Sequence, residues 1–240
     1  MSVGVVMLVF ILLLVLTVPV SISLGMASVL PSMFDPSFTV GAKYLIRAMF
    51  SGLDSFPLLA VPMFVLSGIL MAKGGISKRL FDVFAYFLGN FTAGLPCAVI
   101  VTCLFYGAIS GSGPATVAAV GSMTIPILTS LGYELSFAAS IAAVAGGLGV
   151  IIPPSIPFIM FGMASGASVS DLFLAGIVPG LIIGLLLIFY AMIYCRRHGE
   201  DKEKIGREVR ALHEKGLLTV LKESFFALLS PVIILGCIYT

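Results

Sequence analysis

The sequence predicts an all-α protein that crosses a membrane several times. Sixty per cent of its 240 residues are hydrophobic, only 10% are charged, and the mean hydropathy is +1.19. These values lie well outside the range of soluble proteins. Several apolar runs reach the roughly 20 residues that a membrane-spanning helix needs. The formal net charge of +2 gives no indication of a nucleic-acid partner, so the expected surroundings are the lipid bilayer.

Residues 1–90 are expected to form membrane-spanning helices and helices at the membrane surface. The second crossing contains Pro31 and Pro36 and is predicted to be bent and broken there. The surface helices carry basic residues beside apolar ones, a pattern typical of interfacial helices. The five predicted helices are spans over Val3–Val20 and Pro57–Ala72, a bent crossing over Leu24–Val40, and surface helices over Ala42–Leu53 and Ile76–Leu88.

Residues 93–130 are predicted to form a re-entrant hairpin. Leu95–Ile109 and Ala115–Ser130 would be helices of about 22 and 24 Å, both shorter than the roughly 30 Å hydrocarbon core. They are joined by Ser110-Gly111-Ser112-Gly113-Pro114, within a run that no Lys or Arg interrupts from Leu80 to Cys195. Irregular polar backbone at membrane depth is tolerated only inside protein or beside a water-filled cavity. The joint is therefore a candidate site for a solute or an ion.

Residues 135–166 are predicted to form a broken helix. As one continuous helix, Leu135–Gly166 would run about 48 Å, too long for a crossing without severe tilt. Gly146-Gly147-Leu148-Gly149 and Pro153-Pro154-Ser155-Ile156-Pro157 interrupt it. Glycine and proline both disfavour a helix interior. We therefore expect two half-helices that meet near these residues.

The C-terminal part contains a plain span, a polar connector and one further apolar run. The span covers residues 171–195, and the connector over residues 196–222 alternates in charge, as a solvated helix or loop does. Residues 223–240 are expected to be the start of a truncated span. Basic residues favour cytoplasmic loops, which places residues 196–222 in the cytoplasm. Counting crossings backward then places the N-terminus in the periplasm.

The hairpin tip combines two helix ends of opposite polarity. Pro114 suits the first turn of the second helix, so Ser112 or Gly113 is expected to be its N-cap. That helix end favours an anion, and the free carbonyls near Ser110 favour a cation. Together with the hydroxyls of Ser110, Ser112 and Thr116, these groups could hold an anionic substrate and a sodium ion without a charged side chain. The alternative interpretation is that small residues only allow close helix packing.

The broken helix is expected to supply further oxygen ligands. Because proline has no N–H group, Pro153, Pro154 and Pro157 each leave a carbonyl without its helical partner. Sodium prefers oxygen ligands, so these carbonyls facing the tip would form a cage. The predicted sodium-binding residues are Ser110, Ser112, Gly113, Gly149, Val150 and Pro153. The alternative is a proline kink whose carbonyls bond to neighbouring helices or water.

An enzyme or a transition-metal protein is not expected. The apolar region contains no His cluster, no paired acids and no Ser/His or Cys/His arrangement, so it offers no catalytic residues. The four cysteines lack metal-ligand spacing and suit packing positions. Sodium is therefore the only metal ion expected, and no organic cofactor is expected.

Four stretches resemble the large membrane subunit of tripartite ATP-independent periplasmic (TRAP) transporters, the DctM type. They occur in the order and spacing of that family and lie within residues 50–197, as the N-terminal half of such a subunit would. The matching stretches are FSGLDSFP at Phe50–Pro57, GAISGSGPAT at Gly107–Thr116, GVIIPPSIP at Gly149–Pro157 and FLAGIVPG at Phe173–Gly180.

The resemblance implies a sodium-driven importer of organic acids, such as sialic acid or C4-dicarboxylates, in the bacterial inner membrane. Residues 1–90 would form scaffold helices with interfacial arms, and residues 91–170 would belong to a transport domain that slides against them, an elevator mechanism. The partners would be a small membrane subunit of Q type and a periplasmic substrate-binding protein of P type. The substrate would contact Ser112, Ala115, Thr116 and Ser155.

The family's large subunit has two inverted halves and is much longer than 240 residues. This chain is therefore expected to hold only the first half of the inverted repeat, with one hairpin and one broken helix, and to be inactive alone. An ion channel with a re-entrant filter is the other hypothesis left open. Sodium-dependent accumulation of a solute against its gradient would separate a transporter from a channel.

Overall fold

The computed structural model describes residues 3–34, 42–54 and 56–239, and these residues are helical with short turns and no strand. They divide into two compact units, residues 1–58 and 59–240. The elements, in order, are α1 Val3–Val15, α2 Val20–Phe34, α3 Ala42–Leu53, α4 Phe56–Lys73, α5 Ile76–Leu88, α6 Gly94–Ser110, α7 Gly113–Thr116, the π-helix η1 Val117–Gly121, α8 Ser122–Ser130, α9 Leu135–Gly146, the 3₁₀ helix η2 Gly147–Val150, α10 Ile156–Ser165, α11 Val169–His198, α12 Lys202–Glu214 and α13 Leu217–Tyr239.

In the first unit, the helix predicted over Val3–Val20 is shorter than expected. α1 ends at Val15, the backbone turns at Thr17 with a φ of 59°, and α2 begins after Pro19. The residue before a proline disfavours helical angles, which accounts for the break before Pro19. With 13 residues, α1 is about 20 Å long, less than the roughly 30 Å core.

The predicted break at Pro31 is absent, because α2 continues through it to Phe34. A proline inside a helix removes one backbone hydrogen bond and can bend the helix without ending it. The second predicted break, at Pro36, lies outside the described residues. The helices predicted over Ala42–Leu53 and Ile76–Leu88 have these bounds, as α3 and α5, while their location at the membrane surface stays a prediction.

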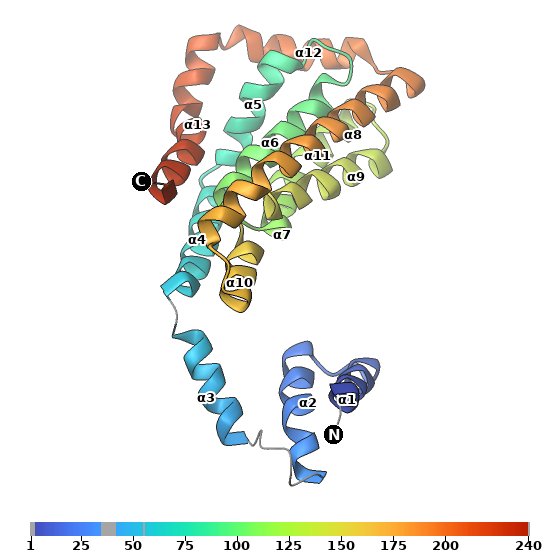
Figure 1. The fold of residues 1–240 in the computed structure, drawn as a ribbon. Helices are drawn as coiled ribbons and strands as arrows, with labels where there is room; N and C mark the ends of the chain where they lie inside the picture. Colours follow the sequence, from blue (N-terminus) through green and yellow to red (C-terminus); the bar gives the residue numbers. More distant parts are fainter. Residues whose placement is uncertain (1–2, 35–41, 55, 240) are drawn as a thin grey trace. The chain divides into compact units, whose positions relative to one another are not determined.

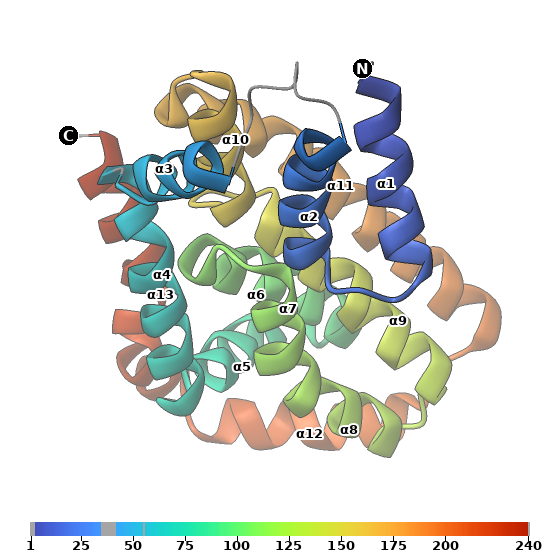
Figure 2. The ribbon, with the colours of Figure 1, turned by 90° about the horizontal axis from the view of Figure 1, so that it is seen from below.

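The second unit is built around α6. Fourteen of the 17 residues of α6 are buried, and the helix packs against α5, α9, α11 and η2. Seen end-on, α6 lies in the interior of the unit (Figure 2). Its sequence is apolar on every side, as a fully enclosed helix requires. The tip that follows α6 and the neighbouring helix α10 lie toward the end of this bundle opposite α12 (Figure 1).

The predicted hairpin is present as two helical arms joined by a short turn, and the predicted broken helix is present as two helical segments separated by a loop. The hairpin arms are α6 and the continuous run of α7, η1 and α8, and the run from α9 through η2 stops before residues 151–155. Residues 151–155 separate η2 from α10, where the prolines were expected to break the helix. The re-entrant placement of the hairpin in a membrane stays a prediction.

Among the helices of the described residues, two are by length and composition able to cross a membrane, or three if α3 and α4 together make one span. These two helices are α11, which was predicted over residues 171–195, and α13, which was predicted over residues 223–240. Both begin earlier in the chain than predicted. α13 has 23 residues and begins at Leu217, six residues before its expected start, whereas the expectation that this span is truncated stays a prediction. The charged pair Lys222-Glu223 lies within the helix, since lysine and glutamate are both good helix formers, and Arg79 of α5 donates to the Glu223 carbonyl at 3.1 Å.

The connector is also more than a solvated segment. Its helix α12 buries Ile205, Val209 and Leu212 and packs against α5. These three residues recur at intervals of four and three, which places them on one helix face. The remaining faces of α12 are polar, so charge alternation along the sequence concealed a buried stripe.

Candidate functional site

The tip of the hairpin is a left-handed turn followed by a capped helix start. Gly111 has a φ of 62°, and Ser112 is extended and accepts a hydrogen bond from the Ala115 N–H at 3.5 Å. Pro114 lies in the first turn, where a missing N–H costs nothing. Of the two N-caps considered from the sequence, Ser112 is the one that the structure has.

Three oxygen atoms gather at this turn. The Thr116 hydroxyl donates to the Ser112 carbonyl at 2.8 Å and lies 3.0 Å from the Ser110 hydroxyl oxygen. The Ser110 hydroxyl oxygen is in turn 3.3 Å from the Ser112 carbonyl oxygen. Ser110 and Thr116 are buried, at 1% and 0% exposure. The result is a compact triangle of neutral oxygens inside the protein.

The broken helix approaches this triangle through glycine. A Cβ atom on Gly149 would lie 2.5 Å from the Thr116 hydroxyl oxygen and 3.2 Å from the Ser112 carbonyl oxygen. On the other side, a Cβ atom on Gly107 would lie 2.5 Å from the Gly149 Cα. Only residues without a Cβ atom allow backbones to come this close. The backbone of η2 is therefore in direct contact with the hairpin tip.

A second contact joins the tip to residues 151–155. The Ile156 N–H donates to the Gly111 carbonyl at 3.1 Å, and a Cβ atom on Gly111 would meet the Pro154 carbonyl oxygen at 2.9 Å. The Pro153–Pro154 peptide bond is cis. The tip thus meets the Pro154 carbonyl of this loop and the first residue of α10, Ile156.

The second half-helix, α10, begins in the same way as the second hairpin arm. Ser155 is its N-cap, accepts from the Phe158 N–H at 3.4 Å and is followed two residues later by Pro157. The Ser155 hydroxyl donates to the Val150 carbonyl, one of the carbonyls that the prolines release. That carbonyl therefore already has one partner.

The predicted sodium ligands are mostly brought together. Ser110, Ser112 and Gly149 meet at the oxygen triangle, and a Cβ atom on Gly113 would lie 2.7 Å from a methyl carbon of Val150. Hydroxyl and carbonyl oxygens are hard, neutral ligands that keep free lone pairs after one hydrogen bond. The donor set thus suits a hard monovalent cation.

The predicted substrate residues divide into two groups. Thr116 and Ser155 are fully buried, with their hydroxyls in local hydrogen bonds. Ala115 instead faces a groove of about 370 Å³ beside α4, which is also lined by Gly68, Lys73, Tyr106 and Ser122. The Ala115 side of the tip therefore faces a groove large enough for a small solute.

Sequence reasoning missed two residues that fix the hairpin. Tyr106 is buried in α6 and donates from its hydroxyl to the Gly68 carbonyl of α4 at 2.9 Å. Glu200, at the turn after α11, accepts from the Ala93 N–H at 3.0 and 3.1 Å and from the Tyr133 hydroxyl. A tyrosine in an apolar run was a possible signal, since buried hydroxyls need partners. Nothing local in the sequence distinguished Glu200 from the other charges of the connector.

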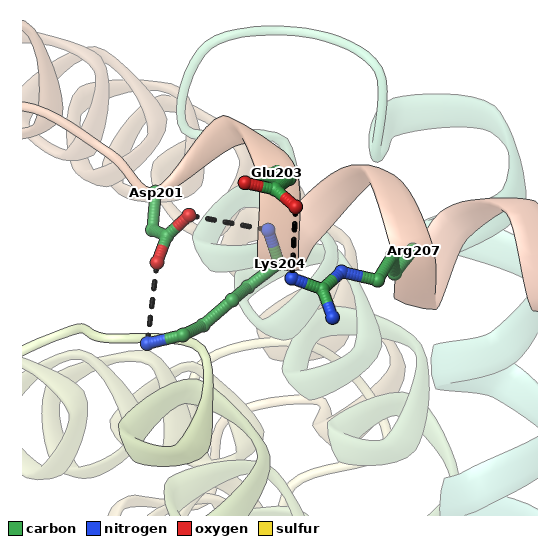
Figure 3. Close-up of polar contacts among 4 residues, drawn as sticks. All are labelled: Asp201, Glu203, Lys204 and Arg207. Carbon is green, nitrogen blue, oxygen red and sulfur yellow. Dashed lines mark hydrogen bonds and ion pairs between the residues drawn. The ribbon is translucent and has the colours of Figure 1, made fainter.

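The first turn of α12 follows directly and shows ordinary surface chemistry (Figure 3). The Asp201 carboxylate accepts from the Lys204 N–H at 3.2 Å and pairs with the Lys204 ammonium at 3.2 Å. Glu203 pairs with Arg207 one turn later at 3.0 Å. The cap holds the pKa of Asp201 below its usual value, chiefly through the Lys204 backbone N–H. These exposed pairs stabilise the helix start only weakly.

The fold and the site define a helical membrane protein whose interrupted helices bring main-chain and hydroxyl oxygens together in its interior. Residues 7–240 match the family described as the tripartite ATP-independent periplasmic transporter, DctM component. The chain belongs to this family. The resemblance stated from four sequence stretches is thereby confirmed.

Three curated relatives illustrate the match. An isethionate TRAP transporter permease protein DctMQ of Oleidesulfovibrio alaskensis is 43% identical over 96% of this chain and 35% of its own length. A C4-dicarboxylate TRAP transporter large permease protein DctM of Vibrio cholerae is 38% identical over 100% of this chain and 51% of its own length. A sialic acid TRAP transporter permease protein SiaT of Haemophilus influenzae is 34% identical over 100% of this chain and 38% of its own length.

The chain therefore spans between about a third and a half of the length of these relatives. All three are named as transporter permeases, in agreement with the prediction that the protein is not an enzyme.

Proposed function

We propose that this chain is the N-terminal part of the large permease subunit of a sodium-coupled transporter that imports small organic acids across the bacterial inner membrane. The observation that carries the proposal is the triangle formed by the Ser110 and Thr116 hydroxyls and the Ser112 carbonyl, closed by the bare backbone of Gly149. Interrupted helices at mid-membrane are typical of transporters that bind ions through main-chain groups. Sodium would supply the coupling energy by binding together with the substrate.

The substrate would bind on the groove side of the tip. Ala115 and Ser122 line that groove together with Lys73, whose ammonium group favours an anion. The N–H groups of the second hairpin arm, which begins at Ser112, favour an anion as well. A small carboxylate or sulfonate fits this polarity, and the named substrates of the relatives are of these kinds.

The rest of the proposed mechanism concerns parts beyond the site. The hairpin and the broken helix would move as a transport domain against scaffold helices, with residues 196–222 in the cytoplasm and the N-terminus in the periplasm. A small membrane subunit would complete the scaffold, and a periplasmic binding protein would deliver the substrate. Family membership supports these partners.

The test is uptake by the complete permease that contains this chain, reconstituted in proteoliposomes with its small subunit and binding protein. We expect one of isethionate, a C4-dicarboxylate or sialic acid to accumulate under an inward sodium gradient. An equal potassium gradient should give no accumulation. Steady ionic current without solute accumulation would favour the channel hypothesis, and uptake independent of sodium would contradict the proposal.

A further inference from the structure

Both ends of the hairpin meet one carboxylate at the base of the second unit. Ala93 is the N-cap of the first arm, α6, and Tyr133 follows the end of the second arm at Ser130 by three residues. The Glu200 oxygens accept two hydrogen bonds from the Ala93 N–H and one from the Tyr133 hydroxyl. Residues 40 positions apart in the sequence are thus held by a single side chain that comes from a third segment.

The Ala93 end explains why a carboxylate suits this position. Ala93 is fully buried with a φ of 60°, and its own side chain cannot cap the helix that follows. The first N–H groups of a helix have no partner within the helix and carry partial positive charge. Glu200 satisfies one such donor with both oxygens and places its negative charge at the positive end of α6.

The Tyr133 end makes the contact specific. Tyr133 follows Gly132, whose φ of 98° turns the chain from α8 toward α9. Burial, together with the hydrogen bond to Glu200, raises the pKa of the Tyr133 hydroxyl above its ordinary value. The hydroxyl therefore stays protonated at neutral pH and always donates. Hydrogen bonds to an ionised acceptor are stronger than those between neutral groups.

The position of Glu200 in the chain determines what it links. Gly199 ends α11 with a φ of 77°, and Asp201 caps α12, so Glu200 lies in the sharp turn between these helices. Within the described part of the chain, its carboxylate makes no ion pair. The Cys195 thiol of α11 contacts it from its own side of the turn, and the Ala93 N–H and the Tyr133 O–H groups contact it from the two hairpin ends, so the link between the segments depends on the hairpin being in place.

We propose that Glu200 is the positioning residue of the hairpin: it fixes both hairpin ends to the α11–α12 turn, so that these segments move as one body. We call this link between Glu200 and the two hairpin ends the clamp. The effect of the clamp on transport rests on the proposed function, whereas the clamp itself does not. The oxygen triangle lies one helix length from Ala93, about 25 Å along α6. The clamp therefore acts on the position of the hairpin and not on the ion ligands.

The test compares Glu200→Ala and Glu200→Gln with Glu203→Ala, a nearby connector glutamate whose only ion pair is exposed. Amide hydrogen exchange is measured by mass spectrometry on the complete permease that contains this chain, in lipid nanodiscs. In Glu200→Ala we expect exchange to rise at least tenfold in the peptides that contain Ala93 and Tyr133. Glu200→Gln keeps one acceptor oxygen and should restore most of the protection, and Glu203→Ala should change exchange less than twofold.

Two results would overturn the clamp. One is an increase in Glu200→Ala no larger than in Glu203→Ala, and the other is an equal increase in every peptide, which indicates general unfolding. Should Glu200→Ala fail to fold, Tyr133→Phe provides the same test at the second end, with exchange expected to rise near Tyr133 and not near Ser110. None of these measurements requires transport, so their outcome is independent of the proposed function.

Transport by the complete permease gives a second readout. A loosened hairpin base should lower the turnover of Glu200→Ala several-fold, with Glu200→Gln close to wild type, while the half-saturating sodium concentration of both variants stays within twofold of wild type. A sodium requirement that rises together with the fall in turnover would show that Glu200 acts on the ion site, contrary to the clamp.

Discussion

At its tip the hairpin is held by neutral groups, whereas at its base it is held by a charged one. The tip uses the hydroxyls of Ser110 and Thr116 and the carbonyl of Ser112, and the base uses the carboxylate of Glu200. Neutral oxygens keep lone pairs available for an ion, whereas the carboxylate is already occupied by the two hairpin ends. The comparison teaches that one hairpin can combine an end whose oxygens are suited to an ion with an end that is anchored by a carboxylate.

The largest effect is expected from a methyl group placed at the tip. Gly149→Ala would put a Cβ atom 2.5 Å from the Thr116 hydroxyl oxygen and within 3.2 Å of backbone. Overpacking of this kind costs up to about 3 kcal/mol. We expect loss of that stability in thermal unfolding and a more than tenfold loss of sodium-driven uptake. Gly147→Ala is the matched control, because a Cβ atom there meets nothing within 4 Å, and it should behave like wild type.

The second-largest effect is expected at the hairpin base, where loss of the Tyr133 hydroxyl should lower the stability of the protein. Tyr133→Phe removes a hydrogen bond to a carboxylate, which costs about 1.5–2 kcal/mol of unfolding free energy. Because the folded-state pKa of Tyr133 is raised, its contribution is fully present below its ordinary pKa of 10 and is lost as the pH rises further. Unfolding measured from pH 8 to 11 should show that the difference between wild type and Tyr133→Phe narrows above pH 10.

The exposed Tyr44 provides the control for this pH dependence. Tyr44→Phe should leave both the stability and its pH profile unchanged. A constant difference between wild type and Tyr133→Phe across the whole pH range would contradict the assigned hydrogen bond to Glu200.

A smaller effect is expected from one hydroxyl of the triangle. Thr116→Val keeps the shape but removes an oxygen that lies 3.0 Å from the Ser110 hydroxyl. One lost polar contact of about 1 kcal/mol corresponds to a roughly fivefold higher half-saturating sodium concentration. Thr124→Val removes a buried hydroxyl that bonds to the Val120 carbonyl in the same arm, and should leave the sodium dependence unchanged. Equal effects of the two variants would argue against an ion at the triangle.

The smallest effect is expected at Asp201, next to the clamp but outside it. Asp201→Asn weakens the cap of α12, so the thermal midpoint should fall slightly at pH 7. Because the folded-state pKa of Asp201 is lowered, its contribution is present above the ordinary pKa of an aspartate and is lost as the pH falls through the lowered value. The difference from wild type should therefore disappear in acid, and a large effect at pH 7 would mean that Asp201 shares the role of Glu200.

The sequence alone determined the class of the protein and the location of its unusual backbone. Gly111, Pro114 and the prolines at 153, 154 and 157 act within a few residues, through missing Cβ atoms and missing N–H groups, so their effect can be read locally. Helix ends inside charged or proline-containing runs were less certain, as α1, α2 and α13 show. Local proline geometry ends α1 before Pro19, whereas α2 runs on through Pro31 and α13 begins before the charged pair Lys222-Glu223.

Only the tertiary structure decided which distant groups meet. The approach of Gly149 to Thr116 and the binding of both hairpin ends by Glu200 join residues 33 or more positions apart, and no local pattern specifies such partners. Glu200 looks like any other charged residue of the solvated connector, and it became an anchor because the folded chain brings it to the buried Ala93 N–H and the half-buried Tyr133 hydroxyl. The physical reason is that side-chain chemistry is set by the residue, whereas its partners are set by the packing of helices.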